Sequence, residues 1–324
     1  MFTNKDIQYK SVFVINCLDK RALRVSNGEL LLEEVHDNER KTLTKMPFQK
    51  MLALFVIGHI TITTPLIEKC KEFNVCLCVM KQNLRSVFFF GESAEANYLL
   101  RQKQYALDKN DITIAKALVN NKIANQLSLL KNTRRKDSLT IDAISLCREN
   151  LMNVTRIQNS ETLLGLEGRS AHAFFAAYYQ DFGWQQRRPR LKCDAINAAL
   201  DIGYTILFNY IESFARMFGF DLYVGVYHRL WFKRKSLICD LVEPFRCIID
   251  KQMRKSWNLG QIKESDFDII KGEYRLKLEK TGEYCRLFYT PLVNYKKEIF
   301  NYIQGYYRSF MKGTDWNEYP IFEV

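Results

Sequence analysis

The spacing of apolar residues changes once along this 324-residue chain, at Gly91, and this change constrains the fold more than any other feature. Before Gly91, short β-rich runs such as 12–15 and 54–62 are separated by polar turns. Asn27-Gly28 lies between two apolar runs, and both residues tolerate the positive φ of a tight hairpin. We therefore predict a small, mostly antiparallel β domain over residues 1–91. Its other elements are expected at 65–73 (a short helix), 75–80 and 86–90 (strands).

From residue 92 onward, residues that favour helices dominate. A larger, all-helical catalytic domain is predicted over residues 92–324, which makes the chain an α+β protein. With only 14 Gly and 6 Pro in the whole chain, long unstructured linkers are not expected. Helices are expected at 94–102, 112–130, 141–152, 162–179, 195–218 and 237–255.

Composition limits which cellular compartment and which kind of binding partner are expected. A formal net charge of +12 favours a polyanionic partner, although a basic protein without such a partner has the same composition. Nine cysteines without a Cys-x-x-Cys pair favour free thiols in a reducing cytoplasm. Residues 1–10 lack the apolar core of a signal peptide, and the apolar stretch 51–67 is too short to span a membrane. We expect a cytoplasmic protein with no membrane association.

Glu167 is a lone acid in the apolar sequence Leu-Leu-Gly-Leu-Glu-Gly at 163–168. A buried carboxylate must be paired, hydrogen-bonded or bound to a cation, because burying a lone charge is costly. It could pair with a neighbour such as Arg169, or it could bind a metal. His228 follows the apolar run 222–227, where an imidazole serves either as a hydrogen-bonded core residue or as a ligand.

Asp240 and Glu243 are three residues apart, so on one helix they would share a face. Pairing with Arg246 or with the basic residues 233–235 would explain both acids without a metal. Taken together with Glu167 and His228, they also form the ligand inventory of one divalent-metal site. Oxygen ligands with one imidazole suit Mg²⁺ or Mn²⁺, which are common in phosphodiester chemistry. The basic clusters 187–190 and 233–235 would attract phosphates to such a site.

The chain resembles the CRISPR-associated spacer-acquisition integrases, the universal metal-dependent nucleases of CRISPR adaptation. The resemblance covers nearly the whole chain and is most specific between residues 163 and 246. The matching segments are Leu-Leu-Gly-Leu-Glu-Gly at 163–168, Arg188-Pro189, 194–197, Gly203-Tyr204-Thr205, 225–228 and 240–246. Two segments depart from the family pattern: Lys233-Arg234-Lys235-Ser236-Leu237 has lysine in place of a usual glycine, and Asp194-Ala195-Ile196-Asn197 lacks a usual proline.

This resemblance implies a β domain followed by a helical domain, and a metal site formed by Glu167, His228 and Glu243 with Asp240 as an accessory acid. It implies insertion of short DNA fragments (spacers) into the CRISPR repeat array by 3′-hydroxyl transesterification. It also implies homodimers, with much of the contact made by the β domain, bridged by a small dimeric CRISPR-associated adaptation protein. The expected phosphate contacts to double-stranded DNA are Arg187, Arg188, Arg234 and Arg246. The alternatives are a non-catalytic nucleic-acid-binding protein and a metal-dependent nuclease of another DNA-processing pathway.

Overall fold

The computed structural model describes residues 4–17, 20–36, 39–91, 97–108, 110–134, 136–228 and 232–324. The predicted division between residues 91 and 92 and the expected helix start at 94 fall at 92–96, outside the described residues. The division into two domains at this point therefore stays a prediction.

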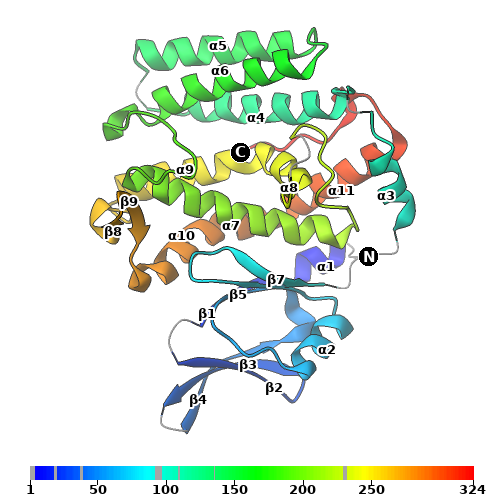
Figure 1. The fold of residues 1–324 in the computed structure, drawn as a ribbon, viewed down its shortest axis with the longest axis vertical. Helices are drawn as coiled ribbons and strands as arrows, with labels where there is room; N and C mark the ends of the chain where they lie inside the picture. Colours follow the sequence, from blue (N-terminus) through cyan, green and yellow to red (C-terminus); the bar gives the residue numbers. More distant parts are fainter. Residues whose placement is uncertain are drawn as a thin grey trace.

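The N-terminal part holds two sheets (Figure 1). A four-stranded sheet has the order β1-β5-β6-β7, with strands β1 (Ser11–Cys17), β5 (Met51–Gly58), β6 (Cys76–Met80) and β7 (Ser86–Phe90). An antiparallel three-stranded sheet contains β2 (Arg21–Ser26), β3 (Glu29–His36) and β4 (Glu39–Pro47). Asn27 and Gly28 have φ of 49° and 75° and join β2 to β3 in the predicted tight hairpin.

The β1-β5 and β5-β6 pairs are parallel, whereas β6-β7 and the pairs of the second sheet are antiparallel. A parallel pair requires a crossover connection, and α2 (Thr64–Glu72) supplies it between β5 and β6. Antiparallel pairs outnumber parallel ones, as predicted, but the buried centre of the larger sheet is parallel.

Strand β5 is buried on both faces, which explains why its apolar run does not alternate with polar residues. Leu54 and Val56 contribute to a core shared with α2 and the second sheet. Phe55 and Ile57 face the opposite way, into the large core formed with the helices. Phe55 stacks on Tyr210 with ring centroids 6.0 Å apart. The β and helical parts of the described chain are therefore packed through a common apolar interface.

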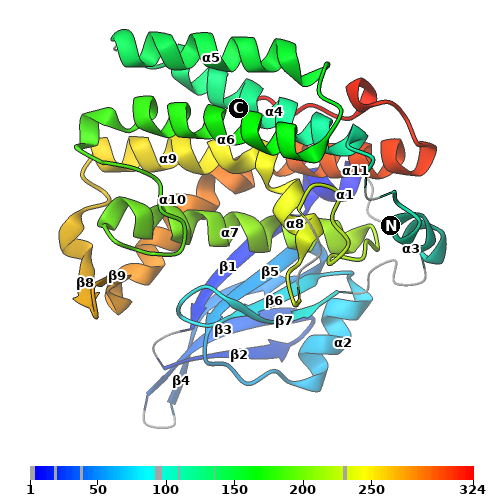
Figure 2. The ribbon, with the colours of Figure 1, turned by 45° about the horizontal axis from the view of Figure 1, so that its top comes forward.

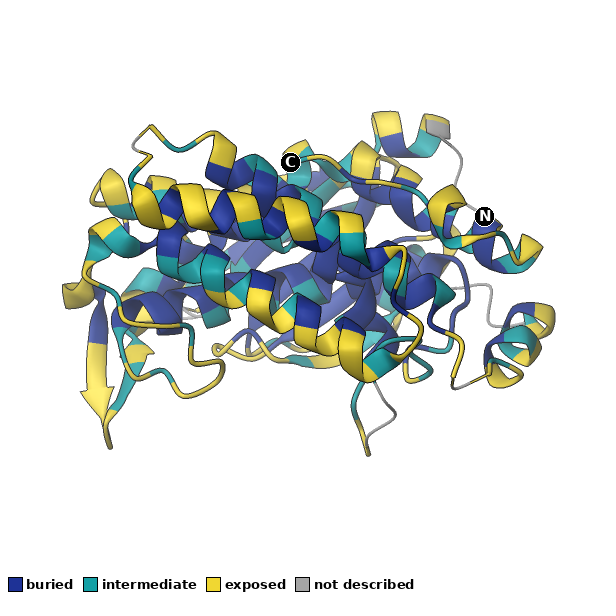
Figure 3. Cartoon of the chain, turned by 90° about the horizontal axis from the view of Figure 1, so that it is seen from above, coloured by how far each residue is buried: buried dark blue, intermediate teal, exposed yellow. Residues whose placement is uncertain are grey.

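The helices form layers above the four-stranded sheet, with α7 and α10 beside it and α4, α5 and α6 farther away (Figures 1 and 2). Their exposed residues face outward and their buried residues face the neighbouring layer (Figure 3). Among the described helices, none is long and apolar enough to cross a membrane. Besides α2, the helices are α1 (Asn4–Tyr9), α3 (Tyr98–Tyr105), α4 (Thr113–Lys131), α5 (Ser138–Val154), α6 (Ser160–Tyr178), α7 (Ala195–Met217), α8 (Ser236–Leu241), α9 (Arg246–Asn258), α10 (Thr281–Asn294) and α11 (Lys296–Lys312).

The α+β class and the order of its two parts are confirmed, and two local predictions need correction. The helix expected over 237–255 is divided: α8 ends at Leu241, a 3₁₀ turn covers Glu243–Phe245, and α9 follows. Pro244 lacks a backbone N–H and clashes with a preceding turn, so a continuous α-helix is disfavoured there. In addition, the part predicted to be all-helical contains a hairpin of β8 (Phe267–Ile270) and β9 (Glu273–Leu276).

Candidate metal centre

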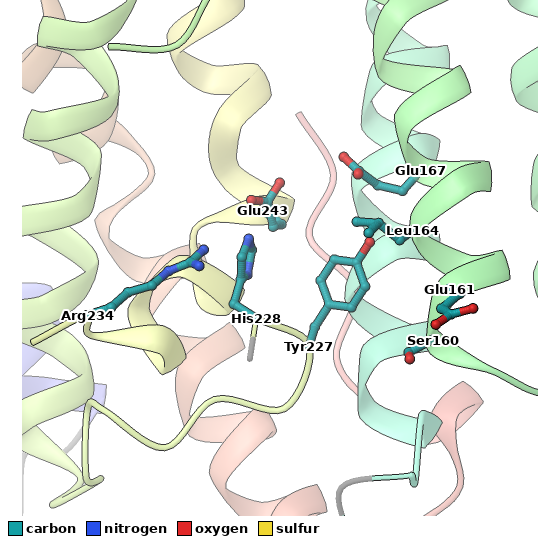
Figure 4. Close-up of a pocket in the computed structure, with 8 residues that line it drawn as sticks. All are labelled: Ser160, Glu161, Leu164, Glu167, Tyr227, His228, Arg234 and Glu243. Atoms are coloured by element: carbon teal, nitrogen blue, oxygen red, sulfur yellow. The ribbon is translucent and has the colours of Figure 1, made fainter. Parts of the chain in front are cut away.

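One cavity of about 510 Å³ brings together four of the residues singled out in the sequence (Figure 4). Glu167 comes from α6, Glu243 from the 3₁₀ turn after α8, and His228 and Arg234 from the connection between α7 and α8. The residues that line the cavity are Ser160, Glu161, Leu164, Glu167, Tyr227, His228, Arg234 and Glu243.

The first turns of α6 place Glu167 at the cavity. The side chain of Asn159 accepts a hydrogen bond from the Thr162 amide at 2.8 Å and so caps the start of the helix. Ser160, Leu164 and Glu167 then share one helical face, because they are four and three residues apart. The neighbouring face, which includes buried Leu163 and Leu166, packs into the core. The apolar residues around Glu167 are therefore its anchor, and the carboxylate lies at the cavity wall.

Asp240 holds His228 through both its backbone and its ring. The carboxylate of Asp240 accepts hydrogen bonds from the amides of Val226 (2.6 Å), Tyr227 (3.2 Å) and His228 (2.8 Å), and it lies 2.7 Å from His228 Nδ1. Gly225 permits this close contact, since a Cβ there would lie 2.7 Å from Asp240 Oδ2. An Nδ1 held by a carboxylate leaves Nε2 for a ligand, and carboxylates commonly orient metal-binding histidines in this way.

Asp240 and Glu243 do not share a helix face, as a single helix would have required. Asp240 lies on α8 and faces the 226–228 loop, whereas Glu243 begins the 3₁₀ turn and faces Arg246 and Lys122. The break at Pro244 separates their contacts. The Asp240 carboxylate contacts the histidine and is not among the residues that line the cavity, and its accessory role stays a prediction.

Lys122 on α4 lies between the two carboxylates of the cavity. Its Nζ contacts Glu167 Oε1 and lies 2.6 Å from Glu243 Oε2. Burial disfavours the charged ammonium, but Glu243 and Glu167 outweigh this effect and raise the pKa of Lys122 above its ordinary value. Sequence inspection missed Lys122, although a lysine within the apolar helix Val-Asn-Asn-Lys-Ile-Ala at 119–124 was a visible signal.

Glu243 makes ionic contacts with two cations, but these contacts do not have hydrogen-bond geometry. Its Oε2 lies 3.0 Å from Arg246 Nε and near Lys122, yet neither contact has the angles of a hydrogen bond within the described chain. Burial opposes ionisation of Glu243, but Arg246 and Lys122 outweigh it and lower its pKa from 4.5 to about 2. The carboxylate is therefore ionised at neutral pH, and its Oε2 is shared by two cations.

The side chains of Glu167, His228 and Glu243 are of the chemical types that bind divalent cations. Two carboxylates and the Nε2 of a carboxylate-held imidazole border one cavity, and a cation, the Lys122 ammonium, already lies between the carboxylates. Among the residues that the structure describes, no three His, Cys, Asp or Glu side chains are close enough to share an ion in this arrangement. Metal ligation by Glu167, His228 and Glu243 therefore requires a shift of these side chains.

The four arginines expected to contact phosphate differ in their availability. Arg234 lines the cavity, and its buried Nε has no hydrogen-bond partner in the described part of the chain. Arg188 is exposed. Arg187 pairs with Asp201 and donates to Asn197 at 2.8 Å, and Arg246 pairs with Glu243. These contacts favour structural roles for Arg187 and Arg246 and leave Arg234 and Arg188 as the candidates for phosphate contact.

Tyr227 is a second residue that sequence inspection left without a role. Its hydroxyl is buried at the cavity and lacks a hydrogen-bond partner among the described residues, and its ring packs edge-on against His228 with centroids 5.4 Å apart. Burial, helped by Glu167 and Glu243, raises its pKa well above the ordinary value, so the phenol remains a donor. Its place directly before His228 was the only sequence signal.

Two acids, an imidazole and an arginine at one cavity are side chains that suit an enzyme acting on phosphate esters. The chain belongs to the CRISPR-associated Cas1 family: the model for CRISPR associated protein Cas1 matches residues 17–289. A CRISPR-associated endonuclease Cas1 of Thermodesulfovibrio yellowstonii is 27% identical over 286 residues, covering 83% of this chain and 89% of that protein. One of Thermus thermophilus is 28% identical over 257 residues, covering 76% and 75%. The relatives support a nuclease of the CRISPR system.

Solved structures agree with this fold. A casposase bound to an integration product matches with a TM-score of 0.75 and 18% identity, covering 97% of this chain and 96% of that one. A CAS1 protein from Thermotoga maritima matches with a TM-score of 0.75 and 17% identity, covering 92% and 97%. At these identities the likeness establishes the α+β fold.

Proposed function

We propose that this protein is a divalent-metal-dependent DNA endonuclease and integrase of CRISPR adaptation that inserts short foreign DNA fragments into the repeat array. The observation that carries the proposal is the convergence of Glu167, His228 and Glu243 on one cavity from three separate segments. Relatives named as CRISPR-associated endonucleases support the nuclease chemistry, and the similar casposase structure, titled as bound to an integration product, supports strand joining.

In the proposed reaction, the 3′-hydroxyl of the incoming strand attacks a phosphodiester at the edge of a repeat. One phosphodiester bond forms as another breaks, and the displaced 3′-oxygen takes up a proton, so no external energy source is needed. Glu167, His228 and Glu243 would hold Mg²⁺ or Mn²⁺, which supplies charge stabilisation at the phosphoryl oxygens and lowers the pKa of the attacking hydroxyl.

The residues around the three ligands have separate tasks in this reaction. Asp240 fixes the His228 ring, so that Nε2 rather than Nδ1 is presented. The Arg234 and Tyr227 donors that have no partner among the described residues would bind non-bridging phosphate oxygens at the cavity.

We also propose its partners and location. Double-stranded DNA, both the spacer fragment and the repeat array, suits the net charge of +12 and the arginine at the cavity. Two similar structures are titled as complexes containing Cas1 and Cas2, which supports a small dimeric CRISPR-associated partner. This chain spans 36% of the matched chain in the first of them. A homodimer through the β domain in a prokaryotic cytoplasm completes the proposal.

Strand transfer into a repeat-containing plasmid with Mn²⁺ tests the proposal. Glu167→Ala and Glu243→Ala should each reduce joining by about 100-fold or more, because loss of even an outer-shell partner of a metal ligand costs roughly 10- to 100-fold. Glu149→Ala removes an exposed acid from α5 and serves as the matched control.

Two results would contradict the proposal in different ways. If both variants join DNA at the wild-type rate, the three residues are not the reaction centre, and a non-catalytic nucleic-acid-binding protein is favoured. If the protein nicks DNA but never joins it with a preference for the repeat, a nuclease of another DNA-processing pathway is favoured.

A further inference from the structure

Lys122 is a buried lysine that contacts two carboxylates, and it has no role in the reaction described above. The exposed fractions of the side chains are 11% for Lys122, 14% for Glu167 and 5% for Glu243, so all three are withdrawn from water. A lysine buried to this extent is rare unless it is paired. Its two partners are the carboxylates assigned above to the metal.

The backbone that carries Lys122 is held in place by neighbours on α4. Asn125, one turn further on, donates to Pro244 O at 2.9 Å and so ties α4 to the turn that presents Glu243. Asn121 and Asn125 also donate to Phe322 O at 2.7 and 2.9 Å. Lys122 is therefore presented to the two carboxylates by a fixed helix, and only its flexible side chain can leave them.

The charges at the site require the Lys122 side chain to leave the two carboxylates if a divalent ion enters. Two carboxylates, Glu167 and Glu243, contact two cations, Lys122 and Arg246, so these four groups balance one another. Glu161 and Arg234, which also line the cavity, cancel, and the Asp240 carboxylate behind His228 adds one negative charge. A divalent ion added while Lys122 stays would leave excess positive charge out of water, which is costly. Arg246 is held by Glu243 and by the Tyr204 ring, 4.8 Å from its guanidinium carbon. Lys122 has no second anchor in the described chain beyond the carboxylates themselves.

We infer that Lys122 is a built-in counter-ion that keeps Glu167 and Glu243 together and competes with the divalent cation for them. The inference rests on the proposed function, because the cation is the one assigned there. Lys122 is a positioning residue: without the metal its ammonium prevents repulsion between the two acids, and with the metal it is displaced from them. The site thereby stays assembled at the expense of metal affinity.

Calorimetric titration of the purified full chain with Mn²⁺ tests the competition. Lys122→Met keeps the side-chain length and removes the charge, and it should bind Mn²⁺ about tenfold more tightly, the change that a loss of about 1.4 kcal/mol of competition produces. Lys116→Met is the matched control, since Lys116 lies on the same helix and its ammonium donates to the neutral Thr155 carbonyl, at 3.4 Å. Equal or weaker Mn²⁺ binding by Lys122→Met would overturn the competition.

A metal-free measurement separates this inference from the proposed function. In EDTA, the thermal stabilities of wild type, Lys122→Met, Glu167→Gln and the double variant form a double-mutant cycle. We expect the double variant to lose less than the sum of the single losses, because removing Glu167 relieves the repulsion that Lys122→Met creates. If Lys122→Met does not fold in EDTA while the double variant does, the coupling is supported in the same way. Additive losses would overturn the counter-ion role.

The outcomes remain distinguishable if the metal assignment fails. Absence of Mn²⁺ binding by both wild type and Lys122→Met would contradict the proposed function and the competition together. The cycle in EDTA would then still decide whether Lys122 holds the two carboxylates, because it involves no metal.

Discussion

Glu243 and Asp250 are buried carboxylates on the same stretch of chain, and their surroundings give them opposite properties. Glu243 contacts two cations, which outweigh burial and lower its pKa to about 2. Asp250 on α9 accepts hydrogen bonds from the hydroxyls of Tyr204 (2.6 Å) and Tyr179 (3.2 Å). Burial dominates there and raises its pKa from 3.8 to about 6, although the two phenols, Arg246 and Arg187 partly offset it.

The difference shows that burial alone does not make an acid a metal ligand. A carboxylate beside cations stays ionised even in acid and retains charge for an incoming ion, whereas the buried carboxylate beside the two phenols keeps its proton up to about pH 6. Asp250 does not line the cavity. The comparison therefore supports the proposed metal-binding role for Glu243 and favours a structural role for Asp250.

The largest expected effect separates Asp240 from Asp250. Asp240→Asn should weaken Mn²⁺ binding by roughly 10- to 100-fold, as outer-shell substitutions commonly do, because an amide cannot accept every contact that the carboxylate makes with the 226–228 loop. Asp250→Asn should leave the Mn²⁺ affinity unchanged, since an amide oxygen can accept from both tyrosines. Calorimetric titration measures both affinities. Equal losses of Mn²⁺ affinity in the two variants would contradict the proposed difference between Asp240 and Asp250.

A smaller effect is expected in the pH dependence of stability. The folded protein binds the Asp250 proton more tightly than the unfolded chain does, so this residue's contribution to the free energy of unfolding falls as pH rises through about 6. Asp250→Asn has no proton to lose and so does not show this fall. The free energy of unfolding of the variant, relative to that of the wild type, should therefore increase by about 1 kcal/mol between pH 5 and pH 7. Glu243 has the opposite sign, because its lowered pKa confines its loss of stability to acid, below about 4.5.

Urea unfolding at several pH values between 5 and 8 provides this measurement. Asp142→Asn, which removes an exposed acid on α5, is the control variant. If the stability difference between Asp250→Asn and wild type does not change with pH, the phenol-capped carboxylate is not protonated more readily than an ordinary one.

Much of this architecture could be predicted from local sequence. The hairpin at Asn27-Gly28 and the long helices are encoded by residues close together in the chain, so their positions were predicted well. The parallel centre of the larger sheet depends on long-range pairing, such as β1 with β5, which no local pattern reveals. The break at Pro244 was visible in the sequence, but its effect on Asp240 and Glu243 depends on packing against α4 and the 226–228 loop.

The candidate site shows the same limit. Glu167, His228 and Glu243 stood out as polar residues in apolar sequence, and the cavity brings them together. Lys122 did not stand out as part of that group, because its link to the two acids exists only after α4 packs beside α6 and the 3₁₀ turn. Family resemblance assigned the ligands, whereas only the folded chain shows which cation accompanies them.

The smallest expected effect concerns the adjacent residues Arg187 and Arg188. Arg187 contacts the ring of Tyr204, whose hydroxyl donates to Asp250. Arg187 is committed to Asp201 and to the Tyr204 ring, 5.4 Å from its guanidinium carbon, whereas Arg188 is exposed. If Arg188 neutralises one phosphate, Arg188→Gln should reduce the slope of log binding constant against log salt by about 0.9, and Arg187→Gln should leave the slope unchanged. Fluorescence anisotropy with a repeat duplex at several salt concentrations gives both slopes. A reduced slope for Arg187→Gln alone would mean that this arginine exchanges Asp201 for phosphate on binding, and that the network around Asp250 takes part in DNA recognition.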